Sequence, residues 1–511
     1  MVLAQLRTLS LLVTYASWAF FQIYSCISIS ISIIKNHINI KVVRMADEDR
    51  VLSWRELLSP KFRLSTLTLA ISIALYATNF FIFATLAPSV VKDIGGLGLM
   101  SWATTIFVVT SIVSSAAGGI IKSWLGSKRS LVLSTIIFAL GSAITAVSPT
   151  IEVVLFGRGV QGLGAGLLTA YSHGMVRDLF PPASWPRMFA VVSGGWGIAA
   201  LSGPLVGGIF AEFEIWRWGF CAMAIAACLF IPLSLRAVQS GDRGETGQAW
   251  GAVLRLSLLG GAALILGSLG KLALPGGDIF LIVASAILLL AAILWERQTI
   301  RPLFPRDMFR PSTVLGGGVI FIFGITFATT PTAIYGPLLF RAIHDIPLVT
   351  TGYIVTAQSI FWTIAAITFS NLSRNGSRLA CTLGPLIVFL GMFTTSHFVP
   401  AGPLWVAIAG VSTIGFGIGL AWGHVGRFVL ETAGDCDKDR VGSVMPTMQL
   451  IGIAFGSAVA GLIANANGFD RTLTDQSAEA VARWIYLGLA PAVLVSIVGA
   501  ISVAAKTRTA V

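Results

Sequence analysis

Charged residues are scarce in this sequence. Lys, Arg, Asp and Glu together make up 11% of the 511 residues, whereas a soluble globular protein has about 25%. Hydrophobic residues make up 55% of the chain, and its mean hydropathy is +0.86. A soluble fold could not bury so much apolar surface, so this composition predicts a protein that crosses a membrane.

Cysteine is also scarce. The chain has five cysteines, and they do not stand in CxxC pairs; no two histidines are three to five residues apart. These absences exclude the usual zinc patterns and a disulfide framework, so we expect no metal and no cofactor. The net charge of +12 does not indicate nucleic-acid binding, because the basic residues are spread between apolar runs instead of forming one patch.

The motifs of nucleotide-binding and hydrolytic enzymes are missing as well. The nearest approach to a phosphate-binding GxxxxGK[ST] loop is Gly270-Lys271, with Ile265 in place of the first glycine and Leu272 in place of the hydroxyl residue. No Ser, His and Asp arrangement suggests nucleophilic catalysis. The sequence therefore favours a protein that is not an enzyme.

Long apolar runs are what the sequence does contain. They are continuous, as in membrane helices, and about 20 residues cross a hydrocarbon core of about 30 Å. The pattern predicts an all-α polytopic membrane protein with fourteen transmembrane helices. These lie near 64–91, 100–121, 130–147, 152–172, 188–211, 218–235, 253–270, 279–295, 313–340, 348–369, 379–398, 403–424, 441–463 and 484–505.

Positive charge is distributed unevenly among the connections. If the first run enters from the cytoplasm, the internal connections and the C-terminus carry nineteen Lys and Arg residues, and the external connections carry six. Cytoplasmic loops normally hold this excess. The bias predicts that both ends of this multi-pass protein are cytoplasmic if the chain starts near Met45. We expect the protein to lie in the plasma (inner) membrane.

Residues 1–44 do not fit this pattern. The run from Leu9 to Ile34 is rich in Ile and Ser, whereas the other runs are rich in Ala, Gly and Leu. A fifteenth helix would also place the N-terminus outside. We interpret this atypical segment as an over-extended start, with Met45 opening the protein; an additional hydrophobic anchor is the alternative.

An internal repeat divides the remaining chain. Ser123-Trp124-Leu125-Gly126-Ser127-Lys128 recurs 250 residues later as Ser373-Arg374-Asn375-Gly376-Ser377-Arg378, and Arg187 and Gly203 recur 253 residues later as Arg440 and Gly456. We predict two six-helix halves at 45–236 and 312–511, with an inserted helix pair at 237–311 between them.

Arg158 is the strongest candidate for a functional residue. It lies inside the fourth predicted span, where an arginine costs about +2.5 to +3.5 kcal/mol at the bilayer centre and therefore needs a polar cavity or a partner. Gln161 follows three residues later, on the same helix face. Snorkelling of Arg158 towards the external surface, near Glu152, is the alternative.

The fifth predicted span is rich in glycine around one proline. Proline kinks a helix, and glycine lets a neighbouring helix approach closely. Both suit a helix that bends or rocks, although glycine-rich membrane helices often mean only tight packing. The residues are Gly203, Pro204, Gly207 and Gly208.

With these features the chain resembles the fourteen-helix drug:proton antiporter family of the major facilitator superfamily, the multidrug efflux type. The resemblance covers residues 55–505 and implies the major facilitator fold and an export function. Its motifs are the Arg158 run, Gly203-Pro204-x-x-Gly207-Gly208, Trp216-Arg217-Trp218, Pro302-Leu303-Phe304-Pro305 and Met308-Phe309.

The chain departs from this family at two places. In the loop after the second span the family has an Asp-Arg pair, which is replaced here by Ser123-Trp124, although Gly119, Gly126, Lys128 and Arg129 are present. This change is expected to weaken a cytoplasmic conformational latch.

In the first span the family has an aspartate where this chain has Asn79, nine residues before Pro88. An asparagine cannot carry a proton. The proton as coupling ion is therefore implied by the resemblance alone, since no mid-span carboxylate supplies it.

Four further residues are candidates for lining a substrate site: Tyr76, Trp196, Gln358 and Gln449. A cavity of aromatic side chains with few polar groups suits hydrophobic or amphipathic small molecules. Because no buried carboxylate is predicted, neutral or anionic compounds are favoured over cationic ones.

The sequence thus predicts a secondary active exporter of small organic or drug-like molecules that works in the lipid bilayer by alternating access. Arg158 would organise the polar centre with Asn79 and Gln161. A periplasmic adaptor protein is a further partner that some relatives use. The alternatives are a facilitated or proton-linked carrier of one metabolite, and a transporter-like sensor without flux.

Overall fold

The computed structural model describes residues 53–180, 185–237, 249–269, 277–299, 302, 304–370, 372–432, 438–469 and 475–507. The predicted segment 1–44 and the start at Met45 lie outside the described residues. In the described part, each predicted span coincides with one long helix. These helices are α3 (Arg63–Ile94), α4 (Met100–Leu125), α5 (Ser127–Ala146), α6 (Ile151–Leu179), α7 (Trp185–Glu212), α8 (Trp216–Ala237), α9 (Ala249–Gly267), α10 (Gly277–Gln298), α11 (Val314–His344), α12 (Leu348–Thr368), α13 (Arg374–Ala401), α14 (Leu404–Glu431), α15 (Lys438–Ala466) and α16 (Asp475–Lys506).

Three short helical segments accompany the long ones: α2 (Trp54–Leu57), η1 (Leu97–Leu99) and η3 (Arg306–Phe309). Thirteen of the described helices are long and apolar enough to cross a membrane. Helix α12 is not among them, and its sequence includes the polar residues Thr350, Gln358 and Ser359. It packs against α7, α11 and α14 within the bundle and buries Thr351 and Thr356.

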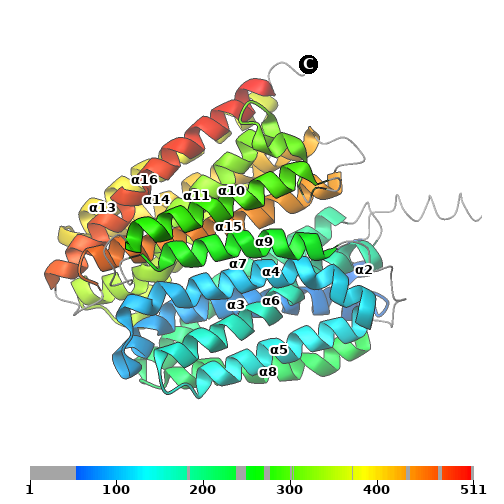
Figure 1. Cartoon of the computed structure of the whole chain (residues 1–511), viewed down its shortest axis with the longest axis horizontal. Coiled ribbons are helices and arrows are strands. Elements are labelled where there is room, and N and C mark those ends of the chain that lie inside the picture. Colours follow the sequence, from blue (N-terminus) through cyan, green and yellow to red (C-terminus); the bar gives the residue numbers. More distant parts are fainter. Residues whose placement is uncertain are drawn as a thin grey trace, which may run out of the picture.

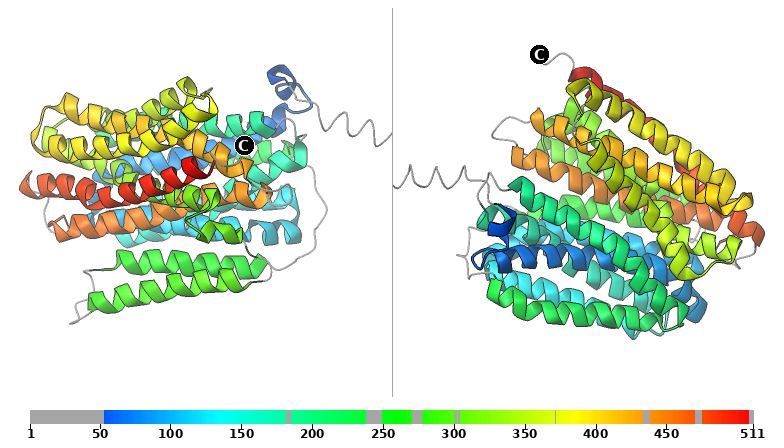
Figure 2. Two further views of the ribbon diagram at one scale, coloured as in Figure 1. Left: turned by 90° about the horizontal axis from the view of Figure 1, so that it is seen from above. Right: turned by 180° about the vertical axis from the view of Figure 1, so that it is seen from behind.

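The helices form two halves (Figure 1), and corresponding helices pack on each other within each half. Helices α3–α8 form the N-terminal half and α11–α16 the C-terminal half, which lie one above the other in Figure 2, right. In the first half α5 packs on α6, α4 on α6 and α3 on α7; in the second half α13 packs on α14, α12 on α14 and α11 on α15. The fold is therefore the predicted one, with two six-helix halves and, between them in the chain, an inserted helix pair.

The inserted pair α9 and α10 lies at the edge of the bundle (Figure 2, left). Helix α9 packs against α4 of one half and α15 of the other, and α10 packs against α9. Nε1 of Trp102 on α4 donates to the Gly267 carbonyl at 2.8 Å. Arg255 and Glu296, both buried, join α9 to α10 through an ion pair with an Nη1–Oε2 distance of 2.8 Å.

The described hydrogen bonds between the halves lie towards one end of the bundle. Oγ1 of Thr105 on α4 donates to Oγ of Ser457 on α15 at 2.9 Å, and Ser457 donates to the Ser101 carbonyl at 3.0 Å. Oγ1 of Thr356 on α12 donates to the Ala200 carbonyl of α7 at 3.0 Å. This is the end at which α4 and α12 begin, and the charge bias of the loops predicts that it faces outside.

Candidate functional site

Arg158, on α6, is fully buried within the N-terminal half, with 0% of its surface exposed. Its Nη1 donates to Oδ1 of Asn79 on α3 at 2.5 Å and to Oε1 of Gln161 at 2.9 Å. Its Nε donates to the Ala103 carbonyl of α4 at 3.2 Å. Arg158 therefore has the partners that an arginine in a membrane requires and does not snorkel to the surface.

Gln161 extends these contacts to a fourth helix. Its Nε2 donates to Oγ of Ser142 on α5 at 2.9 Å, and both residues are buried. We call Asn79, Ser142, Arg158 and Gln161 the Arg158 cluster. Nδ2 of Asn79 is buried without a hydrogen-bond partner. The cluster joins α3, α5 and α6 around one cation, and the Ala103 carbonyl adds α4.

Two aromatic rings also contact the guanidinium. Cζ of Arg158 lies 4.4 Å from the ring centroid of Phe83 on α3 and 4.1 Å from that of Phe107 on α4. Both phenylalanines are buried. A cation within about 6 Å of a ring centroid is attracted by the quadrupole of the ring. The charge is therefore surrounded by neutral oxygens and aromatic rings.

Glycines on α6 bring these groups together. A Cβ at Gly157 would lie 2.4 Å from Oγ1 of Thr145 on α5, and one at Gly162 would lie 2.3 Å from the Phe107 carbonyl on α4. Such distances leave no room for a side chain. The glycine spacing of α6 thus lets its backbone pack directly on two neighbouring helices, which places Arg158 within reach of both.

The Arg158 cluster contains no carboxylate. Among the described residues, the buried carboxylate is Glu296, and it is paired with Arg255 in the inserted pair. Asp93, which pairs with Arg217 at 2.5 Å, is largely exposed at the end of α3. Arg158 is thus a buried cation that no described carboxylate neutralises.

Of the remaining lining candidates, two lie beside the cluster. Tyr76 is buried, with its ring centroid 5.6 Å from that of Phe107 and 5.6 Å from that of the half-buried Trp196 on α7. Gln358 and Gln449 are half-buried on α12 and α15 of the other half, and the described contacts do not join them to the cluster. The structure thus groups the N-terminal candidates and leaves these two apart.

The glycines and proline predicted to act in conformational change lie between α7 and two other helices. A Cβ at Gly203 would lie 2.5 Å from Cβ of Phe81 on α3, and Gly207 packs near Thr85 of the same helix. Cβ of Pro204 lies 2.9 Å from where a Cβ at Gly352 of α12 would stand, and Gly208 packs against Val349. Pro204 and Gly208 therefore lie at the contact between the two halves.

The second group of predicted switch residues lies between α4 and α5. Helix α4 runs to Leu125, so Gly119 is inside the helix and the connection to α5 is Gly126 alone, which has a φ of +78°. Lys128 is half-buried and Arg129 is exposed in the first turn of α5. Trp124, which replaces a family arginine, has its ring centroid 6.0 Å from that of Trp250 on α9. Ser123 and Trp124, which were predicted in the loop after the second span, instead lie in the last turn of α4, and Trp124 contacts the inserted pair.

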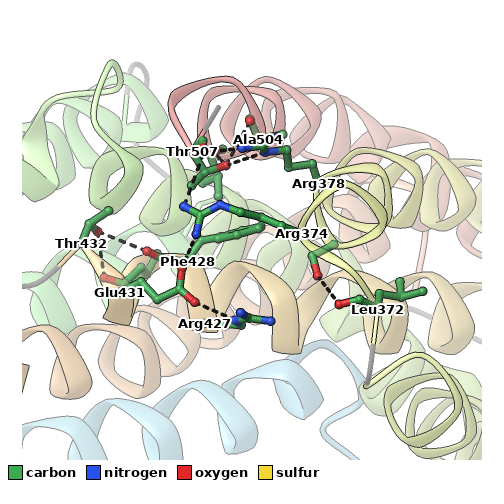
Figure 3. A network of polar contacts seen from close by, with 12 residues as sticks. Leu372, Arg374, Arg378, Arg427, Phe428, Glu431, Thr432, Ala504 and Thr507 are labelled. Atoms are coloured by element: carbon green, nitrogen blue, oxygen red, sulfur yellow. Dashed lines mark hydrogen bonds and ion pairs between the residues drawn. The ribbon is translucent and has the colours of Figure 1, made fainter. Parts of the chain in front are cut away.

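The matching region of the C-terminal half holds a charge network instead (Figure 3). Nη1 of Arg374 lies 3.6 Å from Oε2 of Glu431, and Nε of Arg427 lies 2.7 Å from Oε1 of the same carboxylate. Arg378 donates to the Thr507 carbonyl near the end of α16 and, at 2.8 Å, to Oδ1 of Asn375. These contacts join the ends of α13, α14 and α16.

Sequence reasoning missed Ser142, Phe83 and Phe107. Each belongs to a helix other than α6, and the sequence does not reveal which residues of neighbouring helices meet. The repeated glycines of α6 were the available signal, because they mark the face that packs on α4 and α5. Within the described residues, no group of three or more His, Cys, Asp or Glu side chains is placed to hold a metal ion.

Residues 69–457 of the chain match the family described as the Major Facilitator Superfamily. A "probable multidrug-efflux transporter" of Mycobacterium tuberculosis is 30% identical over 431 residues, which covers 81% of this chain and 90% of the relative. "Multidrug resistance protein 3" of Bacillus subtilis is 22% identical over 416 residues, with 80% of each chain covered.

Solved transporter structures share the fold. The crystal structure of the nucleoside transporter NupG has a TM-score of 0.58 at 14% identity and covers 85% of this chain and 98% of that one. The inward-open xylose transporter XylE from E. coli has a TM-score of 0.55 at 16% identity, covering 83% and 94%. At such low sequence identity, these structures are evidence for the fold alone.

Proposed function

This chain belongs to the Major Facilitator Superfamily, and from that premise we propose that it is a secondary active transporter that exports small organic or drug-like molecules. The observation that carries export is the 30% identity, over 81% of the chain, to a relative named as a multidrug-efflux transporter. The chain is a multi-pass membrane protein, and we propose the plasma (inner) membrane as its location, with both ends of the helical core cytoplasmic.

Alternating access is the proposed mechanism. The described hydrogen bonds between the halves join η1 and the beginning of α4 to α15, and the first half of α12 to the middle of α7. A conformation held at one end is one of the two states that alternating access requires. Opening the other way would break the Thr105–Ser457 and Thr356–Ala200 bonds, and the glycines near Pro204 would permit the sliding of α7 on α12.

The Arg158 cluster is proposed as the polar centre of the transporter. Arg158 is buried and does not itself line a cavity in this conformation, so its role is to fix α3, α4 and α6 around a charge. Tyr76 and Trp196 connect this centre to α7. We propose that Trp196, Gln358 and Gln449, all half-buried, contact the substrate.

Neutral or anionic aromatic compounds are the proposed substrates. The buried positive charge of Arg158 has no described carboxylate beside it, and charge repulsion is strong in a medium of low dielectric constant. A cationic compound near the N-terminal half would therefore be disfavoured. Aromatic side chains such as Phe323 and Phe327, whose centroids lie 5.7 Å apart on α11, suit flat hydrophobic molecules.

Proton antiport is the proposed source of energy, and it rests on the family resemblance. Asn79 stands where a titratable aspartate is usual, so the proton would have to bind elsewhere. A periplasmic adaptor protein is a further proposed partner.

The function is tested by substrate accumulation in transporter-deficient cells that express the full chain. A panel of neutral, anionic and cationic dyes and antibiotics is measured with and without a proton uncoupler. We expect lower accumulation of neutral or anionic compounds, abolished by the uncoupler. Exchange that ignores the pH gradient would instead indicate a facilitated carrier, and binding without flux in vesicles would indicate a sensor.

A further inference from the structure

The buried guanidinium of Arg158 has no anionic partner in the Arg158 cluster. An arginine buried in the membrane interior normally pairs with an acidic residue or with backbone carbonyls, or faces a water-filled cavity. Here the oxygens that accept from its guanidinium belong to Asn79, Gln161 and the Ala103 backbone, which are all neutral. The dipoles of these neutral acceptors compensate only part of the hydration free energy that the guanidinium loses on burial.

Two phenylalanines supply a further stabilising contact. The guanidinium is planar, so its edge can donate hydrogen bonds while its face lies against an aromatic ring. Cζ lies 4.1 Å from the centroid of Phe107 and 4.4 Å from that of Phe83, well inside the range of cation–π attraction. The attraction is strongest when the cation is desolvated, and Arg158 is fully buried.

Both rings are themselves held in place. The backbone of Phe107 is in close contact with Gly162, only four residues from Arg158, and its ring packs on Tyr76. The ring of Phe83 lies 6.4 Å from that of Phe220 on α8. The two rings therefore come from different helices, α3 and α4, and each packs against a further aromatic ring.

The C-terminal half provides an internal comparison. Gly415 packs on the Gln358 carbonyl as Gly162 packs on the Phe107 carbonyl, so Gln358 stands at the position of Phe107. In the same register Val411 stands at the position of Arg158, 253 residues later. Where the arginine is absent, the phenylalanine is absent too.

We propose that Phe83 and Phe107 are positioning residues that hold the Arg158 guanidinium by cation–π contact in place of the missing carboxylate. The proposal rests on the proposed function only for its effect on transport. Its effect on the folded protein can be measured separately.

The first test is a double-mutant cycle on the thermal unfolding of the purified full chain. Phe107→Leu keeps an apolar side chain but removes the ring, and Arg158→Met removes the charge. We expect Phe107→Leu to lower Tm clearly in the wild type and much less in the Arg158→Met background. Phe138→Leu, at a buried phenylalanine of α5 that packs on α6, is the control and should lower Tm equally in both backgrounds. An equal loss for Phe107→Leu in both backgrounds would overturn the proposal.

The second test is transport. Phe107→Leu and Phe83→Leu are each expected to lower the maximal efflux rate by roughly thirtyfold, with little change in KM. A desolvated cation–π contact contributes about 2 kcal/mol, and each 1.36 kcal/mol corresponds to a tenfold change in rate. Phe107→Tyr, which keeps the ring face, should restore most of the rate. Tyr and Leu variants of equal rate would contradict the proposal. If the wild type moves no compound, the proposed function fails, and the unfolding cycle still decides whether the rings hold the arginine.

Discussion

The two halves of the molecule share their glycine contacts but not their buried charge. A Cβ at Gly157 would lie 2.4 Å from Oγ1 of Thr145, and in the other half a Cβ at Gly410 would lie 2.6 Å from Oγ1 of Thr395. These glycines are 253 residues apart and these threonines 250 residues apart. The third helix of each half therefore packs on the fourth in the same way.

The same register places apolar residues opposite the Arg158 cluster. Gly141 faces the backbone nitrogen of Gln161, as Gly391 faces that of Ile414. Ile414 is therefore the positional equivalent of Gln161, and Val411 is that of Arg158. Val411 and Ile414 are both buried. Both halves therefore share the close glycine packing, whereas the buried cation at this position occurs in the N-terminal half. The buried cation is thus the better candidate for function.

The largest effect is expected from moving the charge into the other half. Val411→Arg places a cation where Ile414 stands at the position of Gln161 and Gln358 at the position of Phe107. The amide partner and the aromatic ring that Arg158 contacts at these two positions are missing, so we expect a cost of about 3 kcal/mol on the insertion scale, and more if the cation stays unpaired. We expect little folded protein by size-exclusion chromatography of detergent extracts. Val411→Met is the control and should give normal yields; a well-folded Val411→Arg protein would remove the distinction between the halves.

The shared packing can be tested by filling its glycine positions. Gly157→Val and Gly410→Val each force a side chain against a threonine of the neighbouring helix, and overpacking costs about 1–3 kcal/mol. Both variants should lower Tm by similar amounts. Gly423→Ala, at a glycine with open space around it, is the control. A large loss at one site only would mean that the two halves are not packed alike.

A carboxylate at position 79 should stabilise the N-terminal half. Asn79→Asp would give Arg158 an anionic partner in place of an amide. Loss of one partner from a buried ion pair costs about 3–5 kcal/mol, and burial of the new carboxylate offsets part of the gain, so we expect the stability to rise by less than this amount. The measurement is Tm at neutral pH. In the other half, Gln358→Glu has no described arginine beside it, and its Tm should not rise. A lower Tm for Asn79→Asp would show that the cluster does not need a negative charge.

The smallest effect concerns the ends of the halves. The Arg374–Glu431 pair is partly exposed, so Arg374→Gln should lower stability by about 0–1 kcal/mol and more in low salt than in high salt. Trp124→Ala, in the matching region of the N-terminal half, removes an aromatic contact and should show no such salt dependence. Equal salt dependence of the two variants would contradict this difference.

The sequence was sufficient for much of the fold because apolar runs and glycine spacing are local signals. All fourteen long helices of the described residues were predicted, and Arg158, Asn79 and Gln161 do lie together. The roles of the site residues remain predictions. Phe83, Phe107 and the Trp124–Trp250 contact could not be predicted, since the register between helices depends on how whole faces pack.

The central claim, that energised export depends on the Arg158 cluster of the N-terminal half, is tested most directly by efflux kinetics. Cells are loaded with an exported dye, and its efflux is followed for the wild type, Arg158→Met and the matched Val411→Met at equal expression. We predict that Arg158→Met loses uncoupler-sensitive efflux, whereas Val411→Met retains it. Undiminished efflux by a folded Arg158→Met protein would contradict it.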